Sequence, residues 1–265
     1  MDLDPARGQA MKTSRWAGVG VVLGALTALV WQAPASWLAS GVQALSQERV
    51  QLRQPQGTVW HGSAQWVLAS GAGSQDALAL PQRLSWRLQP QADASLRLEL
   101  SLPCCTPEPL QLSLRPTWTG LTLAFGNGSS QWPLAWLGGL GAPWNTLGLE
   151  GQARLTTQSL QLQWQSGAWQ LQGQAQLQLQ SVASRLSTLR PLGSYALDLQ
   201  GGQTARVQLS TLSGELRLSG QGEWRAQGLH FEGQGQASTG SEAALANLLG
   251  VLGQRQGNTT VLRWG

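Results

Sequence analysis

The stretch from Gln158 to Val182 alternates between apolar and uncharged polar residues, and this alternation limits the folds open to the chain. It reads QSLQLQWQSGAWQLQGQAQLQLQSV. Successive side chains of a β-strand point to opposite faces, so a period of two predicts strands with one apolar face and one wet face. The wet face would usually carry charges, yet here it carries glutamine. The apolar face is therefore a core or the lining of a groove, and the glutamine face suits weak contacts with other proteins.

The Ser166-Gly167 pair in the middle of this stretch predicts a hairpin with a two-residue turn. Such a turn sets Trp164 opposite Trp169 and Leu162 opposite Leu171. Cross-strand pairs of this kind contribute roughly 0.2–1 kcal/mol each. The sequence therefore predicts an antiparallel hairpin with a specific register.

A related segment follows later in the chain, which indicates an internal repeat. SGAWQLQGQA at 166–175 is matched by SGELRLSGQG at 213–222. The same turn would place Thr211 opposite Leu216 and Leu209 opposite Leu218. A glycine recurring at the end of these strands predicts a bulge or bend that curves the sheet. The apolar face predicted from both hairpins consists of Leu160, Leu162, Trp164, Trp169, Leu171, Leu209, Leu216 and Leu218.

The N-terminus predicts a membrane anchor. Three basic residues precede WAGVGVVLGALTALVW, an uncharged run at 16–31 that would be about 24 Å long as a helix. Trp16 and Trp31 stand at its ends like interfacial anchors. We expect a cytoplasmic tail at 1–15, a transmembrane anchor at 16–35 and an exported remainder, because basic flanks stay cytoplasmic.

Two further readings of the anchor stay open. Ala33-Pro34-Ala35 is an A-x-A site that would suit a cleaved signal peptide, although the apolar run is long for one, which favours a retained anchor. Gly20 and Gly24 form a G-x-x-x-G spacing that lets two helices approach closely and so allows a homodimer. The same spacing arises by chance in a run rich in Gly and Ala.

The rest of the chain predicts an all-β fold. We expect a curved antiparallel sheet, or meander of hairpins, behind one N-terminal transmembrane helix. A juxtamembrane helix and linker occupy 36–56, and the periplasmic β-rich domain occupies 57–265, with its two halves joined near 132–145. An amphipathic C-terminal helix is predicted at 241–253, with Ser241 as N-cap and Gly253 as a left-handed C-cap.

Cys104 and Cys105 are adjacent in LPCCTPEP, where the flanking prolines predict a loop between strands. An exported domain meets an oxidising setting that permits disulfides. Neighbouring cysteines close only a small ring, which strains the peptide. The pair is therefore a candidate disulfide or redox pair, and a vicinal disulfide, an intermolecular bridge and two free thiols all remain open.

Motifs for chemistry are missing from the sequence. Charged residues make up only 11% of the chain, too few and too scattered for a nucleic-acid surface. The two histidines, His61 and His230, stand alone on predicted strands, and no metal-ligand, phosphate-loop or nucleophile-elbow spacing occurs. We expect no catalytic site, no metal and no cofactor, and therefore no enzyme.

Segments along the whole chain resemble the type II secretion system protein N family, also called general secretion pathway protein N. No single segment is diagnostic, but their order and spacing together are fairly specific. They follow a short basic tail and a single anchor, and they are GTVWHGSA (57–64), LSWRL (84–88), LGGLGAPWNTLGLEG (137–151), PLGSYALDLQG (191–201), LSGELRLSGQGEW (212–224), LHFEGQGQAS (229–238) and LLGVLGQRQGNTTVLRWG (248–265).

This resemblance implies a single-pass inner-membrane component of the apparatus that exports folded proteins through the outer membrane. Its C-terminal domain would be periplasmic, and its partners would be the inner-membrane platform, the secretin or both. The family has no catalytic residues to carry over. The alternative is an AsmA-like envelope protein that binds or transfers lipid or another apolar ligand, since those proteins also place a curved sheet behind one anchor.

Overall fold

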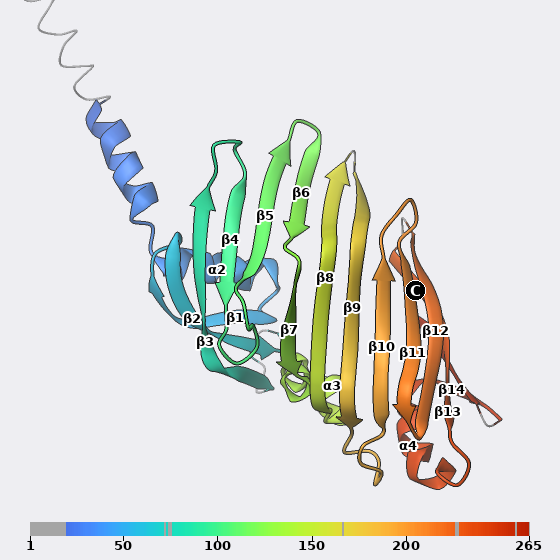
Figure 1. The fold of residues 1–265 in the computed structure, drawn as a ribbon. Helices are drawn as coiled ribbons and strands as arrows, with labels where there is room; N and C mark the ends of the chain where they lie inside the picture. The colour runs from blue at the N-terminus through green and yellow to red at the C-terminus, as the bar shows by residue number, and fades with distance from the viewer. Residues whose placement is uncertain are drawn as a thin grey trace, which may run out of the picture.

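The computed structural model describes residues 20–264 apart from 72, 74, 75, 166, 226, 227 and 258. Most of the described chain is antiparallel β-structure (Figure 1). The strands are β1 Val50–Gly57, β2 His61–Ala69, β3 Ala77–Pro90, β4 Leu96–Ser101, β5 Leu110–Thr117, β6 Gly120–Phe125, β7 Gly128–Pro133, β8 Glu150–Gln165, β9 Ala168–Ala183, β10 Gly193–Gln200, β11 Arg206–Gly214, β12 Leu216–Arg225, β13 Gly228–Ala237, β14 Gln254–Gln256 and β15 Thr259–Trp264.

These strands form a single sheet of 15 strands. Its order is β1-β2-β3-β4-β5-β6-β8-β9-β10-β11-β12-β13-β15-β14, and β7 pairs with β8 beside β6. Neighbours in sequence are thus almost always neighbours in the sheet, as expected for a meander of hairpins. The helices are α2 Ala35–Leu45, the 3₁₀ helix η1 Leu134–Leu140, α3 Trp144–Leu147 and α4 Glu242–Leu252.

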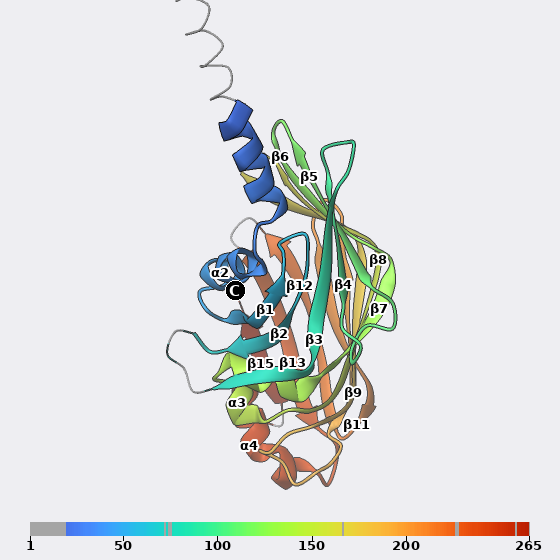
Figure 2. The ribbon, with the colours of Figure 1, turned by 90° about the vertical axis from the view of Figure 1, so that its left-hand side faces the viewer.

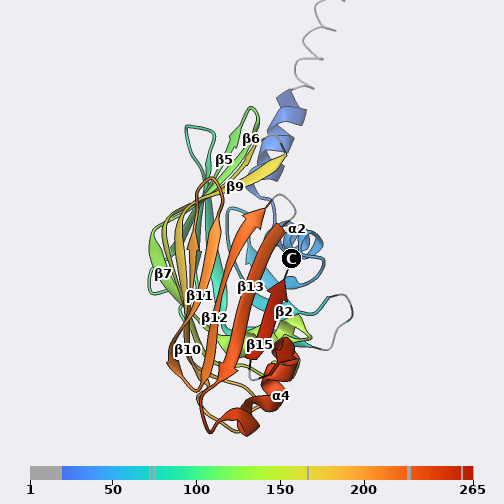
Figure 3. The same ribbon diagram turned by 90° about the vertical axis from the view of Figure 1, so that its right-hand side faces the viewer.

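The sheet is strongly curved (Figures 2 and 3). Both of its ends turn toward the same side, and α2, α3 and α4 lie on that concave side. The opposite, convex side carries no helix in any of the three views. The predicted curved antiparallel sheet with a C-terminal helix is therefore confirmed.

Helices cover the concave face at two places. Ala35 of α2 packs into a buried cluster with Leu84, Trp86 and Leu102 near the first strands. Toward the other end, Leu245 of α4 belongs to a second cluster. A smaller third cluster contains Val207, Phe231 and Leu262 of the last strands. The second cluster is the largest and comprises Leu134, Leu147, Ala153, Val182, Leu192, Tyr195, Leu216, Leu245, Leu248 and Leu249.

The segment at 132–145 joins strands that are far apart in sequence. Its η1 packs against β2, β3 and β8, and α3 packs against η1. Trp132 stacks on Trp136 with ring centroids 5.8 Å apart, and both rings meet Trp66 of β2 edge-on at 5.7 and 5.0 Å. The hydrogen-bonded ladder is continuous from β6 to β8, so this segment covers one sheet and does not link two separate ones.

The predicted register of the β8–β9 hairpin is confirmed. Trp164 pairs with Trp169 and Leu162 with Leu171. Further along, the ladder shifts between Gln158 and Gln161, where Gly173 has a φ of +83°. This bulge moves the apolar residues of β8 from odd to even numbers, so the sheet keeps one apolar face although the sequence changes phase.

The predicted register of the second hairpin is wrong by two residues. Leu209 lies opposite Gly220, not Leu218. Thr211 faces Leu218, whose backbone N–H donates to the Thr211 hydroxyl at 2.6 Å while that hydroxyl donates to the Leu218 carbonyl at 2.8 Å. The Thr211 hydroxyl here takes the place of the backbone hydrogen bonds that would otherwise join β11 to β12. Because the slip is even, the same residues still face the core.

Three element ends differ from the sequence-based expectation. The sheet begins at Val50, inside the segment expected to be a linker at 36–56. Ser241 precedes α4 without a side-chain capping hydrogen bond; its hydroxyl instead donates to Glu215 at 3.2 Å. Gly253 has an extended backbone with φ −179° and is not the predicted left-handed cap.

The chain before α2 is helical from residue 20 to 31 and projects away from the sheet (Figure 1). Every residue from Gly20 to Gln32 is exposed. Trp31 stays near the sheet, with its ring centroid 6.1 Å from that of Trp60. Among the described residues, no helix combines the length and the hydropathy needed to cross a membrane.

Candidate functional site: the two faces of the sheet

The concave face carries continuous rows of apolar side chains across the strands. Directly paired residues share a face of a sheet, so the ladder itself defines these rows. One row, named here the leucine row, takes one residue each from β4, β5, β6, β8 and β9. Its members are Leu96, Leu114, Leu123, Leu162 and Leu171.

The leucine row lies outside the covered part of the face. All five of its side chains are half-buried, and none belongs to any of the three buried clusters formed by the described residues. The helices pack on other parts of the face, because α2 contacts β1 and β2 while α4 contacts β13, β14 and β15. The leucine row is therefore an apolar strip that remains partly exposed to solvent.

The next row toward the strand tips is richer in tryptophan and more exposed. Leu121 pairs with Trp164, which pairs with Trp169. The two indole rings lie 6.5 Å apart and are 40% and 52% exposed. Trp118, in the β5–β6 turn, is fully exposed at 106%. We name Trp118, Trp164 and Trp169 the tryptophan rim.

The eight predicted residues of the apolar face fall into two groups. Leu160 and Leu216 are buried, whereas Leu162, Leu171, Leu209 and Leu218 are half-buried. Leu209, Leu216 and Leu218 pack in the cluster that contains α4. Trp164 and Trp169 pair with each other at the tip of the hairpin and are more exposed than the six leucines.

Sequence reasoning did not single out Trp118, and it assigned the leucines of β4, β5 and β6 to separate strands without joining them into a row. Their own segments, such as SLRLELSL, do alternate, and that signal placed them on strands. Only the pairing of five strands shows that they form one row with Leu162. The sequence signal that could have identified Trp118 is its position in the uncharged turn TWTG at 117–120.

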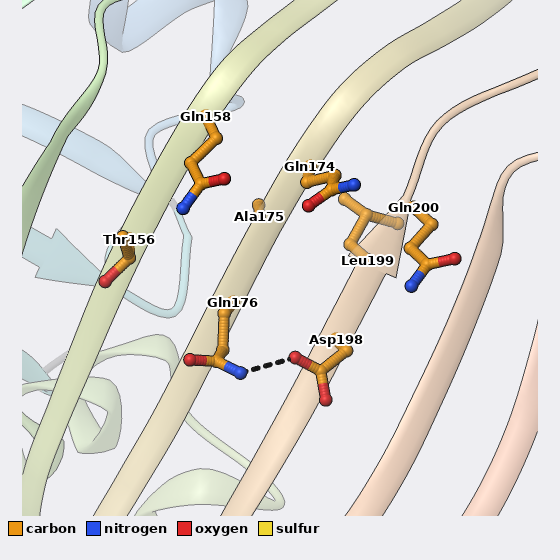
Figure 4. Close-up of a pocket in the computed structure, with 8 residues that line it drawn as sticks. All are labelled: Thr156, Gln158, Gln174, Ala175, Gln176, Asp198, Leu199 and Gln200. Atoms are coloured by element: carbon orange, nitrogen blue, oxygen red, sulfur yellow. Dashed lines mark hydrogen bonds between the residues drawn. The ribbon is translucent and has the colours of Figure 1, made fainter.

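The convex face is polar, and over β8 and β9 it consists mostly of uncharged glutamine and threonine. Figure 4 shows a hollow of about 140 Å³ over β8, β9 and β10. Gln176 donates from Nε2 to Asp198 Oδ1 at 2.7 Å, and Gln178 donates to Gln176 Oε1 at 3.0 Å. Asp198 is the only charged residue lining this hollow, whose other lining residues are Thr156, Gln158, Gln174, Ala175, Gln176, Leu199 and Gln200.

A wider hollow of about 810 Å³ continues over β10 to β13 and gathers more charge. His230 pairs in register with Glu223 and lies two residues before Glu232 on β13, while Arg206 reaches Glu223 at 4.0 Å. No group of three or more His, Cys, Asp or Glu in the described chain could hold a metal. His61 lies elsewhere, exposed on β2 opposite Arg87.

Cys104 and Cys105 are bonded to each other in the β4–β5 loop. Cys104 is exposed, whereas Cys105 is 2% exposed and packs in the cluster beneath α2. The loop is held from inside by Thr106, whose hydroxyl accepts from the Leu102 N–H at 2.8 Å and donates to the Leu102 carbonyl at 3.0 Å. The pair therefore sits between solvent and core.

Of the predicted anchor residues, Trp31, Gly20 and Gly24 belong to the described helix, whereas Trp16 lies outside the described residues. An added Cβ at Gly20 or Gly24 would meet no atom within 4 Å, so this side of the helix is open. Trp60 in the β1–β2 turn holds the helix end, because its indole N–H donates to the Val30 carbonyl at 2.7 Å. The close helix approach predicted from the glycines stays a prediction.

Two side chains have shifted acidities, and neither marks a catalytic centre. Hydrogen bonds from Ser95, helped by Arg115, hold the pKa of the Asp93 carboxyl below its usual value. Burial raises the pKa of the Tyr195 phenol, which donates to the Leu216 carbonyl at 3.0 Å inside the core. The bonds from Ser95 and Arg115 thus explain the Asp93 shift, and desolvation in the core explains the Tyr195 shift.

These features define a class of protein: a large, open antiparallel sheet with a projecting apolar helix, an apolar concave face and a polar convex face. Within that class, the chain matches the family profile "Type II secretion system (T2SS), protein N" over residues 48–262. This is most of the chain, so the protein belongs to that family and is a component of the type II secretion system. No curated protein and no solved structure shows a significant match.

Proposed function

We propose that the protein is a non-enzymatic, single-pass inner-membrane component whose periplasmic sheet takes part in secretion through contacts with the platform, the secretin or both. The carrying observation is the exposed apolar helix at 20–31. Val21, Val22 and Leu23 each expose more than half of their surface, and successive residues of a helix point about 100° apart, so apolar side chains face different sides of it. A helix that is apolar all round needs a bilayer or a partner to cover it.

The junction after the helix supports a retained anchor over a cleaved signal peptide. Ala33 and Ala35 are buried. The Ala33 carbonyl accepts from the Val59 N–H at 2.9 Å, and Pro34 forms an isolated bridge with Thr58. The A-x-A site is thus bonded to the β1–β2 turn of the folded protein, which favours a site that stays uncut.

A pair of leucine substitutions tests the anchor. Leu26→Arg places a charge in the helix at a cost of about 3 kcal/mol on the insertion scale, so we expect the variant to leave the membrane fraction on alkaline extraction. Leu45→Arg is the matched control, because Leu45 is 90% exposed at the end of α2. If both variants stay in the membrane pellet like the wild type, the helix is not the anchor.

Secretion itself tests the role in export. A clean deletion should leave folded substrates of the system in the periplasm, and the wild-type gene should restore their release while the Leu26→Arg variant should not. Normal release from the deletion strain would contradict a required role. Native mass spectrometry of the full chain in mild detergent then identifies the partner, with platform or secretin subunits expected to accompany it.

A second candidate function is favoured by the half-buried leucine row. Apolar side chains that no cluster covers can bind an acyl chain or another apolar ligand, as in the AsmA-like alternative. The same mass spectra would then show bound phospholipid in place of protein partners. Leu123→Gln should remove that lipid, whereas Thr122→Gln should keep it, because Thr122 lies on the other face of β6. Lipid-free spectra for the wild type would contradict this candidate.

A further inference from the structure

We infer that the tryptophan rim contacts the surface of the lipid bilayer from which the helix emerges. This inference rests on the proposed anchor, and it adds a second membrane contact made by the sheet itself. Trp118 lies in the β5–β6 turn, and Trp164 and Trp169 flank the β8–β9 turn. Lipid is thus the partner that this proposal assigns to this end of the concave face, and two arguments support it.

The first argument is placement. The tips of the β5–β6 and β8–β9 hairpins lie at the end of the sheet from which the helix projects (Figures 1 and 3). The helix base is fixed to the sheet, because the Trp60 indole donates to the Val30 carbonyl and the Trp60 carbonyl accepts from the Leu88 N–H at 2.7 Å. A bilayer that holds the helix therefore faces these turns.

The second argument is chemistry. Tryptophan is enriched where membrane meets water, because its ring is apolar and its indole N–H can bond in the headgroup layer. The turns that carry the rim, at 117–120 and 163–170, contain no charged residue. No charge would therefore have to be desolvated when these tips enter the interface.

The neighbouring turn limits the depth of the contact. Asp93 between β3 and β4 forms an ion pair with Arg115 of β5, and both side chains are about half exposed. Charges at this level belong among headgroups and not in the hydrocarbon core. The rim therefore reaches the interfacial layer, with the leucine row just behind it on the same face.

Site-directed spin labels in the full-length protein test this inference. Trp118→Cys places a label on the rim, and Ala168→Cys places one beside Trp169 at the tip of the β8–β9 hairpin. Leu26→Cys places a label in the helix, and Thr188→Cys places one in the β9–β10 loop at the far end of the sheet. All four positions are exposed, so the substitutions spare the fold. One reactive thiol per chain confirms that Cys104 and Cys105 remain bonded to each other.

Collision rates with oxygen and with a water-soluble nickel complex are measured in vesicles of phosphatidylethanolamine and phosphatidylglycerol. We expect the oxygen-to-nickel ratio at 118 and 168 to exceed that at 188 severalfold, with 26 the highest. A lipid-like ratio at 26 with water-like ratios at 118 and 168 overturns the rim contact and leaves the anchor standing. A water-like ratio at 26 instead overturns the proposed anchor. Rim labels shielded from both reagents indicate a protein contact or a second copy and also overturn the inference.

Discussion

The carbonyl of Cys105 accepts a hydrogen bond from the backbone N–H of Gln131 at 2.7 Å. This bond ties the cystine loop to β7, a strand that otherwise pairs only with β8. The buried side chain of Cys105 packs beneath α2 in the same cluster as Trp86 and Leu102. The loop therefore joins the first strands of the sheet to its middle.

Replacing each cysteine by serine should separate the stability contributed by the disulfide from that contributed by burial of the Cys105 side chain. Both Cys104→Ser and Cys105→Ser remove the disulfide, which restricts almost none of the unfolded chain because the residues are adjacent. Cys105→Ser also buries a hydroxyl in an apolar cluster, so it should lower the free energy of unfolding by about 1–3 kcal/mol more than Cys104→Ser. Urea unfolding in detergent measures the difference. Equal losses would mean that burial at 105 does not matter.

Gly220→Ala should destabilise the end of the sheet. An added Cβ would lie 2.5 Å from Phe231 Cζ and 2.8 Å from the Gly233 Cα, and overpacking of this kind costs about 1–3 kcal/mol. Gly250→Ala in α4 is the matched control, since nothing lies within 4 Å of its added Cβ and alanine favours a helix by about 1 kcal/mol. Thermal unfolding should move in opposite directions for the two variants. A neutral Gly220→Ala would show that Phe231 can shift aside.

The alternation of Leu and Gln was enough to predict the β8–β9 hairpin, because a two-residue turn fixes the register of both strands. It also predicted that one face is apolar. The bulge opposite Gly173 was harder to place, since the same alternation continues on both sides of it with a change of phase. Local periodicity reports which residues share a face only while the ladder is unbroken.

The recurring glycines were predicted to bend the sheet, but several serve a partner on the next strand. Gly62 leaves room for Trp86, and Gly220 leaves room for Phe231. This role depends on which strands pair and in which register, and that pairing cannot be read from the sequence. The open end of the concave face was unpredictable for the same reason, because it depends on where α2 and α4 pack and how far they extend.

Thr211→Val should weaken the β11–β12 hairpin more than Thr211→Ser. The Thr211 hydroxyl satisfies both the N–H and the carbonyl of Leu218, and removing it leaves those half-buried groups without this partner, at a cost of about 1–3 kcal/mol. Serine keeps the hydroxyl, so its loss should be smaller. Amide exchange at Leu218 should accelerate in the valine variant only. Unchanged exchange there would show that water replaces the hydroxyl without cost.

Asp93→Asn should remove part of the acid sensitivity of the fold. Ser95 donates to Asp93 Oδ1 from its hydroxyl at 2.6 Å and from its backbone N–H at 3.2 Å, and Arg115 pairs with the other oxygen. These bonds favour the carboxylate and lower its pKa below 3.8. The unfolded chain then takes up the proton first as pH falls.

The sign of the pH effect follows from that order. The stabilisation by Asp93 is complete above its unfolded pKa of about 3.9 and is lost as the pH falls through the lower folded pKa. Urea midpoints of the wild type and Asp93→Asn should therefore differ at pH 6 and converge toward pH 2.5. Ser95→Ala, which removes the hydroxyl donor, should show a smaller decline than the wild type. Parallel decline of the wild type and Asp93→Asn would place the acid sensitivity in other carboxylates. The effect should be modest, because Asp93 and Arg115 are about half exposed and solvent screens their attraction.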